Sequence, residues 1–228
     1  MKAFLFDLDN TLYSYDDAHA AAFDALCAFQ EVVLSLDRET FRARYDEAMG
    51  IQVQRAGENA AAIHNRLIRF QILLEEIGKP VSLAPVLSQR YWSVFLDAVR
   101  PYPGLHTCLD ALREAGYRVG LGTNMTADYQ YAKLERLKVL DRMDFIVTSE
   151  EVNVEKPHRG LFEACAKKAG CAAGDCVFVG DNPVHDIQGA AAAGMVPVWL
   201  CPDPKVPDLP GVRRICSLAE LPGLFRAV

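Results

Sequence analysis

Residues 4–12 read FLFDLDNTL, an apolar run that ends in two carboxylates one residue apart, Asp7 and Asp9. The run from residue 2 to residue 6 is typical of a fully buried strand in a parallel sheet. Ligands of open α/β sheets bind just beyond the carboxyl ends of such strands. The sequence therefore predicts a parallel sheet with Asp7 and Asp9 at the edge where chemistry takes place.

Beyond residue 103 the chain alternates helical and strand-like segments. Apolar residues at helical spacing predict helices over 105–112, 128–137, 160–169 and 183–193, and short apolar runs predict strands over 117–122, 145–147, 176–179 and 196–200. This alternation predicts an α/β fold with a Rossmann-like, doubly wound parallel sheet. Pro197 costs a ladder hydrogen bond, so its strand is expected at a sheet edge. A short strand over 213–216 and a closing helix over 218–227 complete the prediction.

The segment between residues 13 and 101 lacks strand-like alternation and is rich in Ala, Leu, Glu and Arg. It predicts helices over 17–34, 39–49, 60–77 and 83–99, with Asp37 and Ser82 as N-caps and residues 78–80 as a stop. Connections in α/β units usually have about 2–6 residues, so this insertion cannot be a loop. We expect a core domain of residues 1–14 and 101–228 and an all-helical cap of residues 15–100.

Composition narrows the classes of partner. The formal charge is −6 and the basic residues are scattered, whereas binding to a phosphate backbone depends on clustered cations, so no nucleic-acid partner is expected. Seven cysteines without a C-x-x-C pair are typical of a reduced, cytoplasmic protein. The longest apolar stretch, 190–201, contains Gly194 and Pro197 and is too short to span a bilayer, so no membrane partner is expected. The oligomeric state stays open.

Polar residues follow the successive predicted strands. After Asp7 and Asp9 come Thr123-Asn124, then Lys156, then the segment 180–186, which contains two further aspartates. Because the carboxyl ends of parallel strands lie at one edge of a sheet, we expect these residues to converge. Phosphoryl transfer requires the groups that this set supplies: carboxylates, a hydroxyl, an ammonium and backbone N–H groups.

The chain resembles phosphohydrolases of the haloacid dehalogenase superfamily over its whole length. The matching motifs are D-x-D-x-T at Asp7, Asp9 and Thr11, then Thr123, then Lys156, and finally G-D-x-x-x-x-D with Asp181 and Asp186. The helical insertion after the first strand is similar to that of the subfamily whose cap lies at this point of the chain.

The resemblance implies a role for four catalytic residues. Asp7 is the expected nucleophile, which takes the phosphoryl group as an aspartyl-phosphate. Asp9 is expected to protonate the leaving oxygen and then to draw a proton from the attacking water. Dehalogenase members of the superfamily lack this second acid, so Asp9 favours phosphate over halide. Thr123 is expected to donate its hydroxyl to a phosphoryl oxygen, and Lys156 to balance charge on that group and on Asp7.

The resemblance also implies a Mg²⁺ site. Its expected ligands are Asp7, the backbone carbonyl of Asp9, Asp181 and Asp186, an all-oxygen shell that suits this hard cation. Whether Asp186 binds directly or through water stays open. Further contacts to the phosphate are expected from three neighbouring residues, Asn10, Thr11 and Asn124.

We therefore expect a Mg²⁺-dependent phosphatase that hydrolyses a small phosphate monoester, either a nucleoside monophosphate or a sugar phosphate. Two alternatives stay open, a phosphomutase on the same core and a non-catalytic regulatory module on the same scaffold. Eight residues near or in the insertion are interpreted as parts of exposed helical faces rather than as substrate contacts: Tyr13, Tyr15, His19, His64, Arg66, Arg69, Arg90 and Tyr91. Residues 13–16 belong to the hinge that leads into the cap and so are expected closer to the site than the others.

Overall fold

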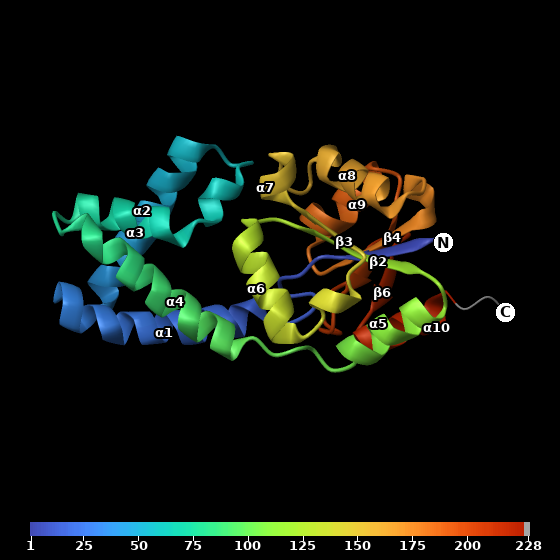
Figure 1. Cartoon of the computed structure of the whole chain (residues 1–228), viewed down its shortest axis with the longest axis horizontal. Coiled ribbons are helices and arrows are strands. Elements are labelled where there is room, and N and C mark those ends of the chain that lie inside the picture. Colours follow the sequence, from blue (N-terminus) through green and yellow to red (C-terminus); the bar gives the residue numbers. More distant parts are fainter. Residues whose placement is uncertain (226–228) are drawn as a thin grey trace. The chain divides into compact units, whose positions relative to one another are not determined.

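The computed structural model describes residues 1–225, and the chain divides into two compact units (Figure 1). Met1–Ser14 and Arg100–Val228 form the first, here named the sheet unit. Tyr15–Val99 form the second, here named the helical unit, in which the described elements are all helices. A segment of helices is thus inserted into the chain directly after the first strand.

The sheet unit contains a six-stranded parallel sheet in the order β3-β2-β1-β4-β5-β6. The strands are β1 (Ala3–Phe6), β2 (Arg118–Thr123), β3 (Phe145–Thr148), β4 (Cys176–Gly180), β5 (Val196–Leu200) and β6 (Arg213–Ile215). The first strand of the chain lies at the centre, paired with β2 on one side and β4 on the other. The predicted α/β fold with a doubly wound parallel sheet is confirmed.

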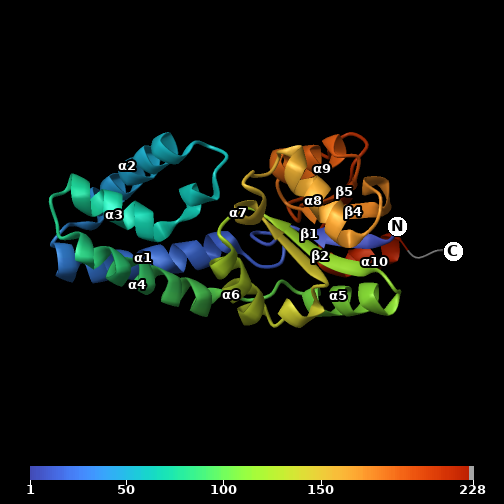
Figure 2. The same ribbon diagram turned by 45° about the horizontal axis from the view of Figure 1, so that its top comes forward.

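Helices cover both faces of this sheet (Figure 2). They are α5 (Leu105–Glu114), α6 (Ala127–Leu137), α7 (Ser149–Val152), α8 (Arg159–Ala169), α9 (Gly189–Ala192) and α10 (Leu221–Leu224). On one face, Leu5 of β1 joins the apolar core that includes Phe162 and Cys165 of α8. On the other face, Phe4 packs edge-on against Tyr117, with ring centroids 4.9 Å apart. Because both faces are covered, β1 is apolar at every position.

The prediction that Pro197 marks an edge strand is wrong. Strand β5 lies between β4 and β6, so the edges of the sheet are β3 and β6. The register gives the reason, because pairing with β6 begins only at Val198, opposite Arg213. Pro197 therefore pairs with β4 alone, and its missing N–H costs no hydrogen bond to β6. The extra strand predicted over 213–216 is confirmed as β6.

Several predicted helices have different bounds. The segment predicted as a helix over 183–193 begins with a π-helical turn, η5 (Pro183–Gln188), before α9. The closing helix predicted over 218–227 is a 3₁₀ turn, η6 (Leu218–Glu220), followed by α10, and residues 226–228 lie outside the described part of the chain. The predicted strand and helix order nevertheless holds along the whole sheet unit.

The helical unit consists of α1 (Tyr15–Leu34), α2 (Arg38–Ala56), α3 (Arg66–Glu76) and α4 (Ala84–Ala98), with short 3₁₀ turns η1 (Ala61–His64) and η2 (Val81–Leu83). Asp37 caps α2 as predicted, accepting from the Thr40 amide at 2.8 Å. Ser82 is not an N-cap, because it lies within η2 and α4 begins one residue later than predicted, at Ala84, with Leu83 in the N-cap position. Instead of one helix over 60–77, the chain turns at η1 and is capped again by Asn65.

Helix α1 packs along α4, and α2 packs against α3. Arg66, Arg69 and Tyr91, predicted on exposed helical faces, are buried in this unit. Arg69, for example, donates to the Gln52 side chain at 2.9 Å and to the Ile63 carbonyl at 2.6 Å, and so ties η1 to the neighbouring helices. Helical periodicity places a residue on a face, whereas the partner that covers the face is decided by the packing.

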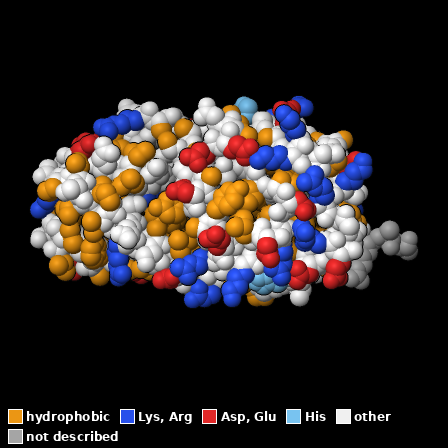
Figure 3. Space-filling view, in the orientation of Figure 1, with side chains coloured by type: hydrophobic (Ala, Val, Ile, Leu, Met, Phe, Trp, Pro, Cys, Tyr) orange, Lys and Arg blue, Asp and Glu red, His pale blue; other side chains and the backbone are white. Residues whose placement is uncertain are grey.

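Among the described residues, no single helix is long and apolar enough to cross a membrane, and the bent pair α1 and α2 meets the length and composition test only when taken together. On the face of the molecule seen in Figure 3, basic and acidic side chains are interspersed.

His19 of α1 is a titratable group inside the helical unit. Its Nδ1 lies 2.8 Å from the hydroxyl of Tyr91. Burial, followed by the positive charge of Arg66, lowers the pKa of His19 to about 4 from its ordinary value near 6.5. The imidazole is therefore neutral in the folded protein at neutral pH, whereas the unfolded chain takes up a proton below about pH 6.5.

We predict that the free energy of unfolding falls as the pH drops from about 6.5 to about 4, partly because of His19. A His19→Gln variant cannot titrate there, so its stability should depend less steeply on pH in this window, and the two curves should run parallel above it. Urea unfolding of both proteins followed by fluorescence at a series of pH values measures the difference. Curves that stay parallel between about pH 6.5 and about pH 4 would contradict the assignment.

Candidate active site at the carboxyl edge of the sheet

Asp7 is the first residue after β1 and is held at the centre of the sheet edge. Its amide donates to the carbonyl of Val179 in β4 at 2.9 Å, so the sheet ladder extends to this residue. The chain then turns back, with the amide of Leu12 donating to the Leu8 carbonyl at 2.9 Å. Asn10 adopts the left-handed region in this turn, with φ 58°, which asparagine tolerates better than most residues. The carboxylate of Asp7 is thus fixed by backbone structure on both sides.

Lys156 brings two aspartates together. Its Nζ lies 2.6 Å from Oδ1 of Asp7 and 2.7 Å from Oδ1 of Asp186. The lysine is only 4% exposed, and a buried ammonium is tolerated only where anions replace its water shell. The loop that carries it is fixed by Asn124, whose Oδ1 accepts from the Lys156 amide at 2.8 Å. Residues from separate strands therefore converge on one charged cluster, as the sequence predicts.

Asp186 reaches the cluster from η5 and packs directly onto β4. Its Oδ2 accepts from the amide of Asn182 at 3.0 Å. A Cβ atom at Gly180 would lie 2.3 Å from the same Oδ2, far inside van der Waals contact. The glycine of the G-D-x-x-x-x-D motif is therefore required by the close approach of this carboxylate to the strand.

Asp7, Asp181 and Asp186 form a possible metal site. Each offers a carboxylate oxygen, and the three atoms lie within 4.8 Å of one another. Burial raises the pKa of Asp7 to about 7 and that of Asp181 to about 6; the charge of Asp186 adds to both shifts, and Lys156 opposes them. One ammonium does not balance three carboxylates, two of them buried and that of Asp181 partly buried. A hard divalent cation with oxygen ligands fits this cluster by charge and by donor type.

Thr11, Thr123 and Asn124 lie around this cluster, but their contacts differ from those expected. The Thr11 hydroxyl donates to Asp181 at 3.3 Å. Thr123 is buried and accepts from the Gln130 side chain at 2.6 Å. Within residues 1–225, neither Thr123 nor Asn124 hydrogen-bonds to the three aspartates. Their expected contacts to a phosphoryl group stay predictions, as does the metal contact through the Asp9 carbonyl.

The carboxylate of Asp9 belongs to a second charged group. Lys133 of α6 donates to both of its oxygens, at 2.8 and 2.9 Å, and the hydroxyl of Tyr13 donates to one of them. Tyr13 is fully buried, so its interpretation as part of an exposed face is wrong. The two neighbouring acids of the first motif therefore have different partners, Lys156 for Asp7 and Lys133 for Asp9.

Lys133 is a residue that the sequence analysis missed, together with Gln130 on the same helix. Both occupy the buried stripe of α6 that Leu134 and Leu137 continue at helical spacing. The sequence signal for Lys133 is its place within the apolar stripe of a helix. A lysine in such a stripe is buried when the helix packs and must then be paired with another group.

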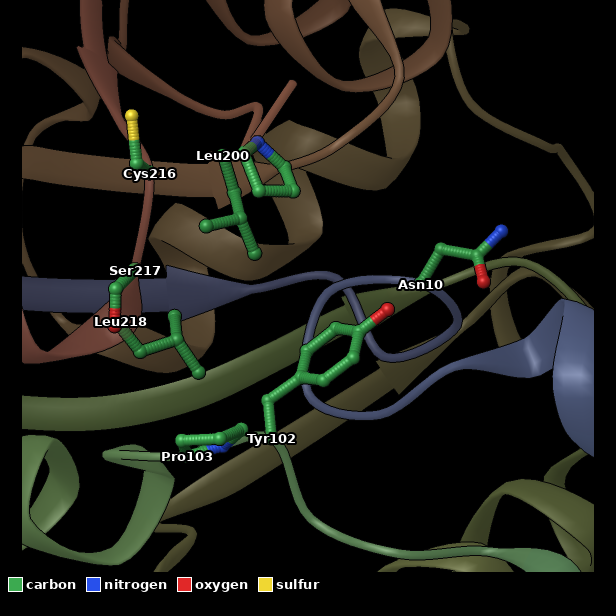
Figure 4. Close-up of a pocket in the computed structure, with 8 residues that line it drawn as sticks. Asn10, Tyr102, Pro103, Leu200, Cys216, Ser217 and Leu218 are labelled. Atoms are coloured by element: carbon green, nitrogen blue, oxygen red, sulfur yellow. The ribbon is translucent and has the colours of Figure 1, made fainter. Parts of the chain in front are cut away.

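An apolar pocket of about 280 Å³ opens beside the turn that carries Asn10 (Figure 4). It is lined mainly by hydrophobic side chains of the sheet unit: Tyr102, Pro103, Leu200, Pro202 and Leu218, with Cys216 and Ser217. In Figure 4 the ring of Tyr102 points toward the turn of Asn10. Because the three aspartates do not line this pocket, it is distinct from the charged cluster.

This arrangement can perform nucleophilic chemistry on an electrophile with anionic oxygens. It offers a buried carboxylate paired with a lysine, a second carboxylate in hydrogen-bond contact with its own donors, and an oxygen-rich cation site.

Comparison with known proteins agrees with this geometry. Residues 1–194 match the family model described as haloacid dehalogenase-like hydrolase. The chain is 37% identical over 203 residues to a ribulose-1,5-bisphosphate 5-phosphatase of Halopiger xanaduensis, covering 88% of this chain and 84% of that protein. It is 35% identical over 206 residues to a glyceraldehyde 3-phosphate phosphatase of Methanopyrus kandleri, with coverage of 88% and 84%.

Among solved structures, a 2-haloacid dehalogenase from Pseudomonas syringae superposes with a TM-score of 0.80 at 26% identity, covering 98% of this chain and 97% of that one. Sequence, fold and site geometry thus agree, and the chain belongs to the haloacid dehalogenase-like hydrolase family.

Proposed function

We propose that this protein is a Mg²⁺-dependent phosphatase that hydrolyses a small sugar phosphate through an aspartyl-phosphate. The observation that carries the proposal is the contact of Asp7 with Lys156 inside a cluster of three carboxylates, of which those of Asp7 and Asp186 are buried. The names of the two sequence relatives, both phosphatases of phosphorylated sugars, support hydrolysis over the mutase and the non-catalytic alternatives.

In the first step, an oxygen of Asp7 attacks phosphorus and the bond from phosphorus to the ester oxygen breaks. Asp9 gives its proton to that leaving oxygen, which departs as the alcohol. In the second step, water attacks the aspartyl-phosphate while Asp9 takes a proton from it, and the Asp7 carboxylate is regenerated as phosphate leaves. Lys156 offsets negative charge on Asp7 and on the transferred group throughout.

Asp7, Asp181 and Asp186 would hold Mg²⁺, with the Asp9 carbonyl as a further ligand. When bound, the ion neutralises charge on the phosphoryl oxygens and on the Asp7 carboxylate. It also opposes the effect of burial, the largest cause of the raised pKa of Asp7, which is about 7 and so disfavours the ionised nucleophile.

The names of the two sequence relatives support one class of substrate. One relative is named for a pentose bisphosphate and the other for a triose phosphate, so we place the substrate among small sugar phosphates rather than nucleotides. We further propose that residues 15–100 serve as the cap and that Thr123, Asn10, Thr11 and Asn124 contact the phosphate.

All seven cysteines are free, which supports a cytoplasmic location.

The nucleophile is tested by Asp7→Asn, an isosteric change that removes the attacking carboxylate. Phosphate release from a panel of triose, pentose and hexose phosphates should fall by more than about 10³-fold. Asp46→Asn makes the same change on an exposed helix and should leave the rate unaltered. Equal activity of the Asp7 variant would overturn the proposed mechanism, and conversion of a hexose 1-phosphate into an isomer with little free phosphate would favour a mutase.

The metal site is tested apart from catalysis. Mg²⁺ that binds the folded protein should raise its melting temperature in a concentration-dependent way. Asp181→Asn replaces a charged carboxylate ligand by a neutral amide, so the shift should require at least about 10-fold more Mg²⁺. Differential scanning fluorimetry measures both, with Asp46→Asn as the control. A shift that is identical in the Asp181 variant would place the ion elsewhere.

Gly180→Ala tests the packing of Asp186 on β4. The added methyl would meet Oδ2 at 2.3 Å, so the carboxylate or the strand must move. We expect a loss of about 1–3 kcal/mol of stability together with a marked fall in phosphate release. Gly50→Ala adds the same methyl inside α2, where nothing lies within 4 Å, and should leave both properties intact or raise stability slightly. Wild-type activity in the Gly180 variant would show that the close approach is not needed.

A further inference from the structure

Lys133 is a fully buried lysine that the catalytic steps above do not use. It lies on α6, is 0% exposed and contacts both oxygens of Asp9 at 2.8 and 2.9 Å. Its Nζ also lies 3.5 Å from the sulfur of Met125. A lysine is almost never fully buried unless it is paired, so the contact with Asp9 accounts for its presence at this position.

The partner carboxylate is not equally buried. The side chain of Asp9 is 26% exposed, in contrast to the nearly complete burial of the Asp7, Lys156 and Asp186 group. A partly exposed aspartate side chain without fixed partners exchanges between rotamers. The bidentate contact with Lys133, together with the Tyr13 hydroxyl, holds Asp9 in one orientation.

Orientation matters for a group that transfers a proton. A general acid acts only within hydrogen-bond reach of the atom that it protonates. The backbone at Asp9 is fixed by the turn after β1, and its carboxylate is fixed from a helix 124 residues away in the sequence. Lys156 cannot serve this purpose, because its Nζ is already shared between Asp7 and Asp186.

We propose that Lys133 is a positioning residue that holds the carboxylate of Asp9 in place for proton transfer to the leaving oxygen. The inference rests on the proposed phosphatase function and assigns to this site a second lysine, with a role separate from that of Lys156. In the step concerned, the bond from phosphorus to the ester oxygen breaks, its electron pair stays with that oxygen, and the proton from Asp9 joins it.

The role has a signature in the leaving group. A sugar alcohol is a weak acid, so its oxygen must be protonated as it departs, whereas p-nitrophenol is acidic enough to leave as the anion. Loss of a correctly placed acid therefore slows the first step, in which the ester bond breaks, on alkyl phosphates and spares the same step on p-nitrophenyl phosphate. Hydrolysis of the aspartyl-phosphate, in which Asp9 takes a proton from water, is common to both esters, so the first step is the one that distinguishes them. A general loss of structure slows both esters equally.

The experiment compares wild type and Lys133→Met in the rate of the first step on ribose 5-phosphate and on p-nitrophenyl phosphate. This rate is measured as release of the sugar or the phenol in a single turnover with the protein in excess. Methionine keeps the length of the chain and suits the apolar stripe of α6. We expect the first-step rate on the sugar ester to fall by about 10- to 100-fold and that on the aryl ester to fall by less than about threefold, while the protein concentration at half-maximal rate changes little. Lys167→Met makes the same change on an exposed lysine of α8 and should behave as wild type.

Two further variants separate positioning from folding. Asp9→Asn should show the same preference for the aryl ester, and adding Lys133→Met to it should cost nothing more, because both act through one group. Lys133→Arg should recover part of the sugar-ester rate. If Lys133→Met fails to fold, Tyr13→Phe removes the other donor to Asp9 and should give the same selective loss at smaller size.

Equal losses of the first-step rate on both esters, independent effects of the two changes in the double variant, or an unaltered first-step rate on the sugar ester would each overturn the proposal. These outcomes differ from failure of the proposed function. In that case the wild-type protein would release no phosphate from either ester, or Asp7→Asn would retain full activity.

Discussion

The ammonium of Lys156 between the carboxylates of Asp7 and Asp186 is the contact on which the site depends. It joins a loop beyond β3 to the residue after β1 and to the turn after β4. Burying one charge of this kind is costly, and leaving one unpaired is more so, because no water replaces the lost partner. The three charged groups are therefore stable only together, which fixes the relative positions of the segments after β1, β3 and β4 that carry them.

The strand order explains why this arrangement is reached. The chain places β1 between β2 and β4, so the carboxyl ends that carry Asp7, Thr123 and the segment after Gly180 are neighbours. Gly180 has no side chain, which leaves the space that the Asp186 carboxylate occupies against the strand. The excess of carboxylate over ammonium that results makes the cluster suitable for a divalent cation and unsuitable for an isolated phosphate.

The two acids of the first motif have different surroundings although only one residue lies between them. Asp7 is buried and belongs to the cluster of Lys156, whereas Asp9 is partly exposed and bound by Lys133 and Tyr13. Different surroundings are what allow one carboxyl to act as nucleophile while its neighbour handles protons. The fold obtains this difference by directing one lysine from a loop and the other from a helix.

The sequence alone determined the parallel sheet, the helical insertion and the convergence of Asp7, Lys156, Asp181 and Asp186, because apolar periodicity and the position of polar residues after strands are local properties of the chain. Asp37 could be predicted as a cap for the same reason, from its place before a helix. Only the tertiary structure decided that Pro197 lies in an inner strand, since this depends on where β6 begins to pair. It also decided that Lys133, Tyr13 and Arg69 are buried, because no local pattern records which face another element will cover. Lys133, for example, contacts Asp9 from 124 residues away.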